Sequence, residues 1–192
     1  MKYINKHFFN TLEIKQSKFI AHLIPFNEYE TKLKELKEEH PKARHFVTAS
    51  RHLNEYNQIV EHFSDDGEPK GTSGKPSLMV LQGQDIINSA VIIVRYFGGT
   101  KLGTGGLVRA YSDAVNFVLY LADLIEYKEE ITKIISFSYS NIRKVEYECS
   151  NARVNILNKN FEANTVFEIK GSKTDIEEVL NRLDRIVTID FS

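Results

Sequence analysis

Nine of the ten glycines in this 192-residue chain lie between Gly67 and Gly106. Most of them fall in two clusters, at residues 65–76 and 95–109, with apolar segments on either side. Glycine costs conformational entropy when it is folded, so glycines gather where the backbone turns sharply or lies close against another group. A flexible linker is also rich in glycine, but it lacks flanking strand and helix patterns. The two clusters therefore predict tight loops between regular elements, and they mark the expected functional surface.

The composition is that of an ordinary globular protein, with 42% hydrophobic and 27% charged residues. No segment approaches the roughly 18 consecutive apolar residues of a transmembrane helix, and the N-terminus lacks a secretory apolar segment. The single Cys149 fits a reducing compartment. We therefore expect a cytoplasmic protein with no membrane association. A formal net charge of −1 argues against coating nucleic acid by bulk positive charge, although a local basic patch is still compatible with it.

Strand and helix patterns divide the chain into two expected domains, residues 1–125 and residues 131–192, separated by the charged segment 126–130. The second domain has the strand, helix, strand, strand, helix, strand order of a ferredoxin-like βαββαβ unit. The expected fold class is α+β.

The segments beside the glycine clusters have strong patterns of their own. They predict a short helix from Pro76 to Leu81, a buried strand over Ser89–Phe97 and a long helix over Gly105–Leu124. The second cluster then lies between a strand and a helix, which is a common setting for anion sites.

Neither cluster matches a named phosphate-binding motif. A Walker A motif needs Ser or Thr after Gly-Lys, but Gly74-Lys75 is followed by Pro76. The dinucleotide fingerprint needs a third glycine where this chain has Val108. A nucleotide-hydrolysing enzyme or a dinucleotide-binding enzyme is therefore not expected.

The second cluster can still bind an anion. Glycines at the start of a helix expose backbone N–H groups at the positive end of the helix dipole, and hydroxyl and cationic side chains lie nearby. The alternative is that the glycines only allow the two loops to pack together, and the sequence leaves both possibilities open. The candidate residues for binding nucleic acid or another anion are Lys75, Arg95, Lys101, Gly103, Thr104, Gly105, Gly106 and Arg109.

The acidic residues of the first cluster favour a structural role. Asp65-Asp66-Gly67-Glu68 offers oxygen ligands to Mg²⁺ or Ca²⁺, but it lacks EF-hand spacing, and acids before glycine are usual in turns. We favour an internal ion pair of Asp65 or Asp66 with Arg95 or Arg109. The expected loop-stabilising residues are Asp65, Asp66, Glu68 and His45. We expect no metal ion and no cofactor.

The sequence does not require catalytic residues. A Ser-His-Asp set can be composed from Ser73, His45 and Asp66, but nothing in their spacing demands it. The aromatic pair Tyr96-Phe97, at the end of the buried strand, can stack on bases or pack under the glycine loop.

Five segments together resemble the signature of the YigZ/IMPACT family. They are Ala43–His45, Phe63–Pro69, Gly71–Pro76, Val94–Gly99 and Lys101–Tyr111. The resemblance spans the first 125 residues, and the remainder is similar to the small C-terminal domain of bacterial YigZ-type members. One departure is Ser73, where alanine is usual.

The resemblance implies an N-terminal domain with the fold of domain IV of elongation factor G, and a ferredoxin-like domain similar to domain V of that factor. It also implies a role in translation, because eukaryotic IMPACT proteins regulate translation by binding an activator of a stress-responsive initiation-factor kinase. Fold alone does not fix function.

From these observations we expect a non-enzymatic, translation-related regulatory protein that binds RNA or a ribosome-associated partner through its two glycine-rich loops. Two alternatives stay open: a protein–protein adaptor that does not bind nucleic acid, and an enzyme acting on a small phosphate-bearing molecule. The sequence does not specify an oligomeric state.

Overall fold

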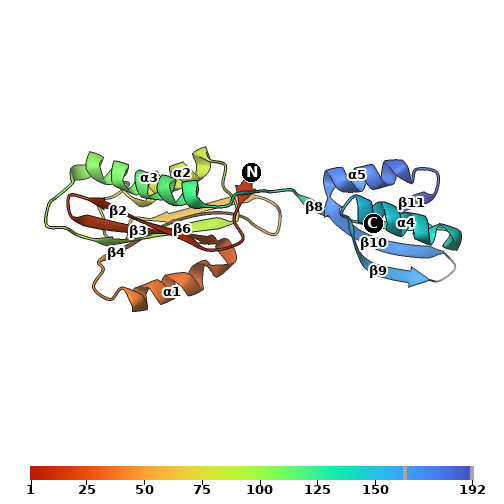
Figure 1. The fold of residues 1–192 in the computed structure, drawn as a ribbon, viewed down its shortest axis with the longest axis horizontal. Helices are drawn as coiled ribbons and strands as arrows, with labels where there is room; N and C mark the ends of the chain where they lie inside the picture. Colours follow the sequence, from red (N-terminus) through yellow and green to blue (C-terminus); the bar gives the residue numbers. More distant parts are fainter. Residues whose placement is uncertain (162–163, 191–192) are drawn as a thin grey trace. The chain divides into compact units, whose positions relative to one another are not determined.

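The computed structural model describes residues 1–161 and 164–190. The chain folds into two compact units, Met1–Tyr127 and Lys128–Ser192 (Figure 1). Both units combine helices with antiparallel sheets, which confirms the expected α+β class.

The first unit is built on a five-stranded sheet with the strand order β2-β3-β6-β4-β5, in which all neighbours are antiparallel. Its elements are β1 (Lys2–Tyr3), β2 (Phe8–Ile14), β3 (Ser17–Pro25), η1 (Phe26–Glu28), α1 (Tyr29–Glu39), β4 (His45–Leu53), β5 (Ile59–Ser64), α2 (Gly74–Gly83), β6 (Ser89–Tyr96), α3 (Gly103–Leu121) and β7 (Ile125–Glu126). The short strands β1 and β7 pair with each other.

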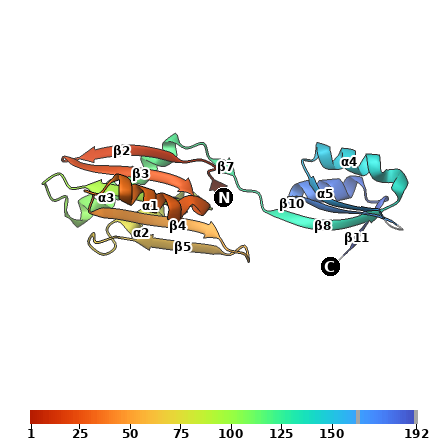
Figure 2. The ribbon, with the colours of Figure 1, turned by 90° about the horizontal axis from the view of Figure 1, so that it is seen from below.

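Helices cover both faces of this sheet: α1 lies on one face, and α2 and α3 lie on the other (Figures 1 and 2). Side chains alternate between the two faces along each strand, so one strand contributes to two cores. In β3, Phe19 and Leu23 pack in the core under α2 and α3, whereas Ile20 and Ile24 pack in the core under α1. The continuous burial of β6 has the same cause, because both of its faces are covered.

The strand order brings the two glycine clusters to one edge of the sheet. Both β5 and β6 run antiparallel to β4, so they point the same way and their carboxyl ends lie at the same edge. The first cluster connects β5 to α2, and the second connects β6 to α3. Both helices therefore begin at this edge.

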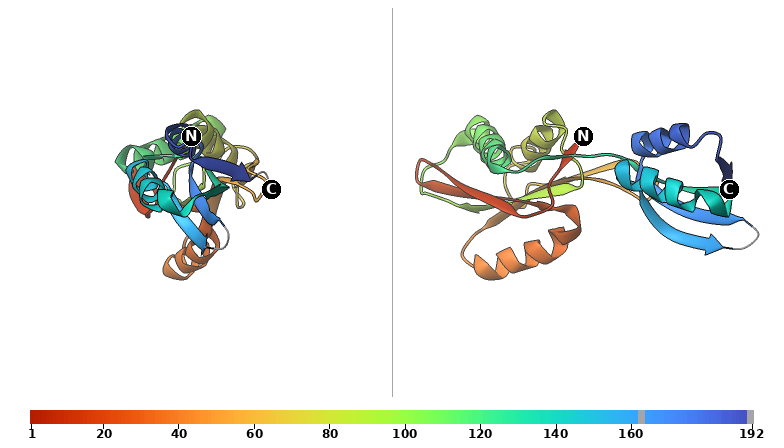
Figure 3. Two further views of the ribbon diagram at one scale, coloured as in Figure 1. Left: turned by 90° about the vertical axis from the view of Figure 1, so that its right-hand side faces the viewer. Right: turned by 45° about the vertical axis from the view of Figure 1, so that its right-hand side comes forward.

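The second unit has a four-stranded antiparallel sheet with the order β11-β8-β10-β9, and its element order is that of a ferredoxin-like fold. Its elements are β8 (Glu130–Phe137), η2 (Tyr139–Asn141), α4 (Ile142–Asn151), β9 (Asn155–Phe161), β10 (Thr165–Ser172), α5 (Lys173–Arg182) and β11 (Val187–Asp190). Both α4 and α5 lie on the same side of the sheet (Figure 3). Alternate residues of β10, such as Phe167 and Ile169, form the core with these helices.

The two helices beside the glycine clusters differ from the sequence expectation by two or three residues at each end. The helix expected from Pro76 begins at Gly74, and the helix expected from Gly105 begins at Gly103. All of Gly103–Gly106 therefore lies in the first turn of α3. The strand pair β1 and β7 was not expected, because a two-residue strand has no periodic pattern to detect.

Candidate functional site

The first glycine loop is organised by the carboxylate of Asp65. Its oxygens accept hydrogen bonds from the backbone N–H of Gly71 at 2.6 Å, of Ser73 at 3.1 Å and of Gly74 at 2.8 Å. The Ser73 hydroxyl donates a further bond at 3.0 Å. Burial opposes ionisation of Asp65, but these hydrogen bonds outweigh it and lower its pKa. A negative charge held against the first amides of α2 also stabilises the start of that helix.

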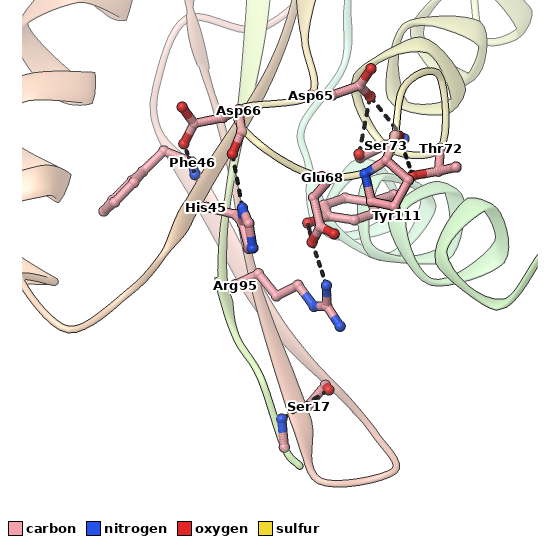
Figure 4. Close-up of polar contacts among 12 residues, drawn as sticks. Ser17, His45, Phe46, Asp65, Asp66, Glu68, Thr72, Ser73, Arg95 and Tyr111 are labelled. Atoms are coloured by element: carbon pink, nitrogen blue, oxygen red, sulfur yellow. Dashed lines mark hydrogen bonds and ion pairs between the residues drawn. The ribbon is translucent and has the colours of Figure 1, made fainter. Parts of the chain in front are cut away.

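The next residue, Asp66, ties the same loop to β4. Its side chain accepts a hydrogen bond from the backbone N–H of Phe46 at 2.6 Å, and its carbonyl oxygen lies 2.8 Å from Nδ1 of His45 (Figure 4). Asp66 has a left-handed backbone conformation, with φ of 42°. These contacts extend the pairing of β4 beyond the end of β5 and hold the loop at the sheet edge.

The two strand ends are joined by a buried polar cluster of Glu68, Arg95 and Tyr111 (Figure 4). Glu68 Oε1 forms an ion pair with Nη1 of Arg95 and accepts a hydrogen bond from the Tyr111 hydroxyl at 2.8 Å. Burial and the adjacent Glu68 raise the pKa of Tyr111 above its ordinary value, so the hydroxyl remains a donor. The cluster links the first loop, the end of β6 and α3. The expected pairing of Asp65 or Asp66 with an arginine is therefore wrong, because both carboxylates bond backbone groups instead.

Two glycines are required by close packing. A Cβ on Gly98 would lie 2.0 Å from the backbone carbon of Gln16, and one on Gly74 would lie 2.6 Å from the carbonyl oxygen of Ser64. Gly98 also donates a backbone hydrogen bond to the Ser17 hydroxyl at 3.1 Å. These two positions hold the loops against neighbouring strands, where any side chain would collide.

Other glycines of the clusters face open space. A Cβ on Gly71, Gly99, Gly103 or Gly105 would meet nothing within 4 Å. The first three have φ between 75° and 87°, so their backbone conformation explains the glycine. Gly105 has neither a positive φ nor a close neighbour, and glycine there weakens the helix. The packing of the loops thus accounts for some of the glycines and leaves Gly105 without a reason in the fold.

A pocket of about 350 Å³ lies between the two loops. Its lining is Glu68, Pro69, Arg95, Phe97, Lys101, Leu102, Gly103, Thr104 and Leu107. Four of the candidate binding residues, Arg95, Lys101, Gly103 and Thr104, therefore come together around it. The other four, Lys75, Gly105, Gly106 and Arg109, are not part of this lining.

The candidate cations differ in exposure. Arg95 is only 6% exposed and is ion-paired with Glu68, so it is not a free surface charge. Its guanidinium carbon lies 5.3 Å from the ring centre of Phe19 and 5.8 Å from that of Phe97. In contrast, Lys75, Lys101 and Arg109 are exposed, and within the described residues none of the three is ion-paired with a carboxylate.

Sequence reasoning missed part of this site. Tyr111 was noted only as the last residue of the family segment Lys101–Tyr111, and Pro69, Leu102 and Leu107 were not assigned to a pocket. Tyr111 carried a usable signal, because a tyrosine on an otherwise apolar helix face needs a polar partner for its hydroxyl. The three apolar pocket residues carried none.

In residues 1–161 and 164–190, no group of three or more His, Cys, Asp or Glu side chains is placed to hold a metal ion. No helix in this part of the chain combines the length and the apolar character needed to cross a membrane.

Comparison with known proteins identifies the family. The sequence profile of the Impact N-terminal domain matches residues 15–119. The chain belongs to the IMPACT family. The resemblance found in the sequence is thereby confirmed, and the profile spans the whole of the site described above.

Bacterial IMPACT proteins match over most of the chain. An IMPACT family member of Haemophilus influenzae is 39% identical over 175 residues, which is 89% of this chain and 84% of that protein. The Bacillus subtilis member YvyE is 32% identical over 158 residues, covering 81% of this chain and 72% of its own length. A crystal structure of a protein described as hypothetical superposes with a TM-score of 0.68 at 27% identity, over 98% of this chain and 95% of that one.

Proposed function

We propose that this IMPACT-family chain is a non-enzymatic regulatory protein of translation, and that it binds RNA or a ribosome-associated partner through its two glycine-rich loops. The observation that carries the proposal is the arrangement at one sheet edge. Two helices begin there, and Lys75, Lys101 and Arg109 are exposed on them or beside them. Helix starts and exposed cations of this kind are groups that contact phosphates in complexes with nucleic acids.

The start of α3 supports the proposal further. Within the described residues, no side chain caps this helix, so its first N–H groups are left for an external acceptor. The start of α2 differs, because Asp65 already occupies it. An anionic partner would therefore contact the backbone at α3 and the Lys75 side chain at α2.

The family supports the connection with translation. Members of the YigZ/IMPACT family in eukaryotes act on translation, and this chain shares the family's N-terminal domain. We infer the regulatory role from membership of the family. We infer an anionic partner from the exposed cations and the uncapped helix start at the loops.

The polar groups of the loops support a non-enzymatic role. The carboxylates of Asp65, Asp66 and Glu68 are each held by hydrogen bonds within the fold. Groups held in this way are poor general acids or bases, because a proton transfer would break the contacts that shape the loop. Burial also raises the pKa of the Cys149 thiol to about 11, so it is not a ready nucleophile.

The proposal is tested by reversing the exposed charges. Lys75, Lys101 and Arg109 are replaced together by Glu in the full chain. Binding is measured by fluorescence anisotropy with a labelled single-stranded RNA and by cosedimentation with ribosomes. Three phosphate contacts predict that the logarithm of the RNA association constant falls with the logarithm of salt with a slope of about −2. The triple variant should lose at least about tenfold in affinity at low salt.

A matched control makes the same change of net charge elsewhere. Lys34, Arg143 and Lys144 are exposed on α1 and α4 and belong to neither glycine loop, so their replacement by Glu should leave affinity nearly unchanged. Equal losses of RNA affinity in the two triple variants would show that only the net charge of the protein matters, and would contradict the proposal. Ribosome binding that survives both the loop variant and high salt would point to the adaptor alternative instead.

A further inference from the structure

We propose that the pocket between the two glycine loops binds a single nucleoside phosphate unit, with its base against Phe97 and its phosphate at the start of α3. This inference rests on the proposed function and specifies it further: the loops would bind an unpaired nucleotide and not only a phosphate backbone. The unit could be part of an RNA strand or a free nucleotide, and the experiment below separates these two sources.

The pocket lining has an apolar part and a polar part, as a ligand with a base and a phosphate requires. Pro69, Leu102 and Leu107 provide apolar contacts, and Lys101 and Thr104 provide a charge and a hydroxyl. The volume of about 350 Å³ is at the lower end for small-molecule sites, which suits one nucleotide better than several. A bare phosphate or carboxylate would gain nothing from the apolar part of the lining.

Arg95 lies in the pocket lining with unused hydrogen-bonding capacity. It is 94% buried, as the 6% exposure of its side chain shows, and a guanidinium carries five N–H donors. Among the described residues it pairs with Glu68, and its Nε is buried without a hydrogen-bond partner. A buried donor left unpaired is costly. A base with carbonyl or ring-nitrogen acceptors would meet the guanidinium where Arg95 lines the pocket, whereas the Nε itself is enclosed by the protein.

The start of α3 offers a place for the phosphate beside the same pocket. Gly103 and Thr104 belong both to the pocket lining and to the first turn of the helix. Added side chains at Gly103 and Gly105 would extend into open space, so the backbone N–H groups are approachable from outside. Lys101 adds a positive charge two residues before the helix begins.

Phe97 provides a surface on which a base can stack. It follows directly on β6 and is 53% exposed, although its ring contacts the Arg95 guanidinium. An exposed aromatic ring beside a cation is the usual stacking platform of proteins that bind single-stranded nucleic acid.

The experiment measures binding of four probes to the full chain by isothermal titration calorimetry and by amide chemical shifts. The probes are adenosine 5′-monophosphate, adenosine, inorganic phosphate and a short single-stranded oligoadenylate. We expect the monophosphate to bind at least about tenfold more tightly than adenosine or phosphate alone. The amide signals of Gly103, Thr104 and Gly105 should shift with the monophosphate.

The key variant is Phe97→Ala, which should weaken monophosphate binding by about tenfold or more, whereas Phe97→Tyr should restore it. The matched control is Phe117→Ala, because Phe117 is 50% exposed on α3 but lies outside the pocket lining. Circular dichroism of each variant confirms that the fold is kept. Lys101→Ala should abolish the advantage of the monophosphate over adenosine.

The outcomes separate this inference from the proposed function. If Phe97→Ala binds the monophosphate as tightly as the wild type, the pocket assignment is overturned, even where the charge-reversed triple variant loses RNA. If the oligoadenylate displaces the monophosphate, both proposals are supported. If the monophosphate binds at the pocket but no RNA does, the pocket assignment stands and RNA binding by the loops is overturned.

Discussion

Single side chains hold the two loops together, and Tyr111 shows how much depends on one hydroxyl. Its OH donates to Glu68, whose carboxylate also pairs with Arg95 in the interior. Removing the donor leaves a buried carboxylate with one partner fewer. A hydrogen bond to a charged buried group has a larger effect on stability than one between neutral groups.

Tyr111→Phe should therefore lower the free energy of unfolding by about 1–3 kcal/mol, because the Glu68 carboxylate loses a buried donor. The measurement is urea denaturation, in which the dependence of the free energy of unfolding on urea concentration should be the same in the variant and the wild type. Tyr120→Phe is the matched control, since Tyr120 is 88% exposed on the same helix. A loss in Tyr111→Phe no larger than in the control would show that the hydroxyl does not stabilise the cluster.

A second polar site, on the face of the sheet under α1, gives the fold a dependence on pH. His22 is buried, its Nδ1 lies 3.0 Å from Nε2 of His7, and its Nε2 has no hydrogen-bond partner in the described part of the chain. Burial, with smaller contributions from His7, His40 and Lys32, lowers the pKa of His22 to about 3 from 6.5. Between these values the unfolded chain binds a proton that the folded chain does not.

The contribution of neutral His22 to stability is therefore fully present above pH 6.5 and is lost as the pH falls toward 3. Between about pH 3 and pH 6.5 the free energy of unfolding of the wild type should fall as the pH falls. His22→Leu should reduce this slope by up to about 1.4 kcal/mol per pH unit, since it removes the titrating group. Denaturation at a series of pH values across this range measures the slope. His62→Gln, at an exposed position on β5, should retain the wild-type slope. A wild-type slope in His22→Leu would refute the assignment.

At the scale of elements, Gly98 and Gly105 of the second cluster differ in their surroundings: one is closely packed and the other faces open space. A methyl group on Gly98 would collide with the backbone at Gln16, whereas one on Gly105 would meet nothing within 4 Å. Alanine is also the better helix former. The same substitution should thus have opposite effects at these two positions.

Gly105→Ala should raise the free energy of unfolding by about 1 kcal/mol, and Gly98→Ala should lower it by about 1–3 kcal/mol. Thermal denaturation of the two variants beside the wild type provides the measurement. Destabilisation by Gly105→Ala would mean that the glycine is required by the fold after all.

Much of this architecture follows from periodicity. The buried strand and the long helix around the second cluster, and the βαββαβ order of the second unit, are visible in the spacing of apolar residues. The exact helix starts are not visible in this spacing, because Asp65, nine residues before Gly74, fixes the start of α2 through a hydrogen bond. The partner of Arg95 was likewise hidden: the sequence favoured Asp65 or Asp66, but the loop backbone places Glu68 against the guanidinium instead.

At the scale of the whole molecule, each unit has its own hydrophobic core. The cores under α1 and under α2 and α3 belong to residues 1–127, and the core of α4 and α5 belongs to the second unit. Independent cores are the physical requirement for independent folding.

The fragments 1–127 and 128–192 should therefore each fold alone with a cooperative thermal transition, and the first should keep the RNA affinity of the full chain. Calorimetry and anisotropy on the two fragments test this. The first fragment must include Tyr127, because β7 pairs with β1 near the start of the chain. A fragment 1–127 that folds but loses RNA affinity would place part of the binding surface on the second unit.

The pairing of β1 with β7 has a topological consequence. Lys2 lies opposite Glu126, and Tyr3 lies opposite Ile125, so the backbone enters and leaves the first unit at neighbouring points. A short peptide could join these points into a ring without crossing the fold. The first unit should therefore tolerate circular permutation, with its present ends joined and new ends opened in the turn at the exposed residues 55–57.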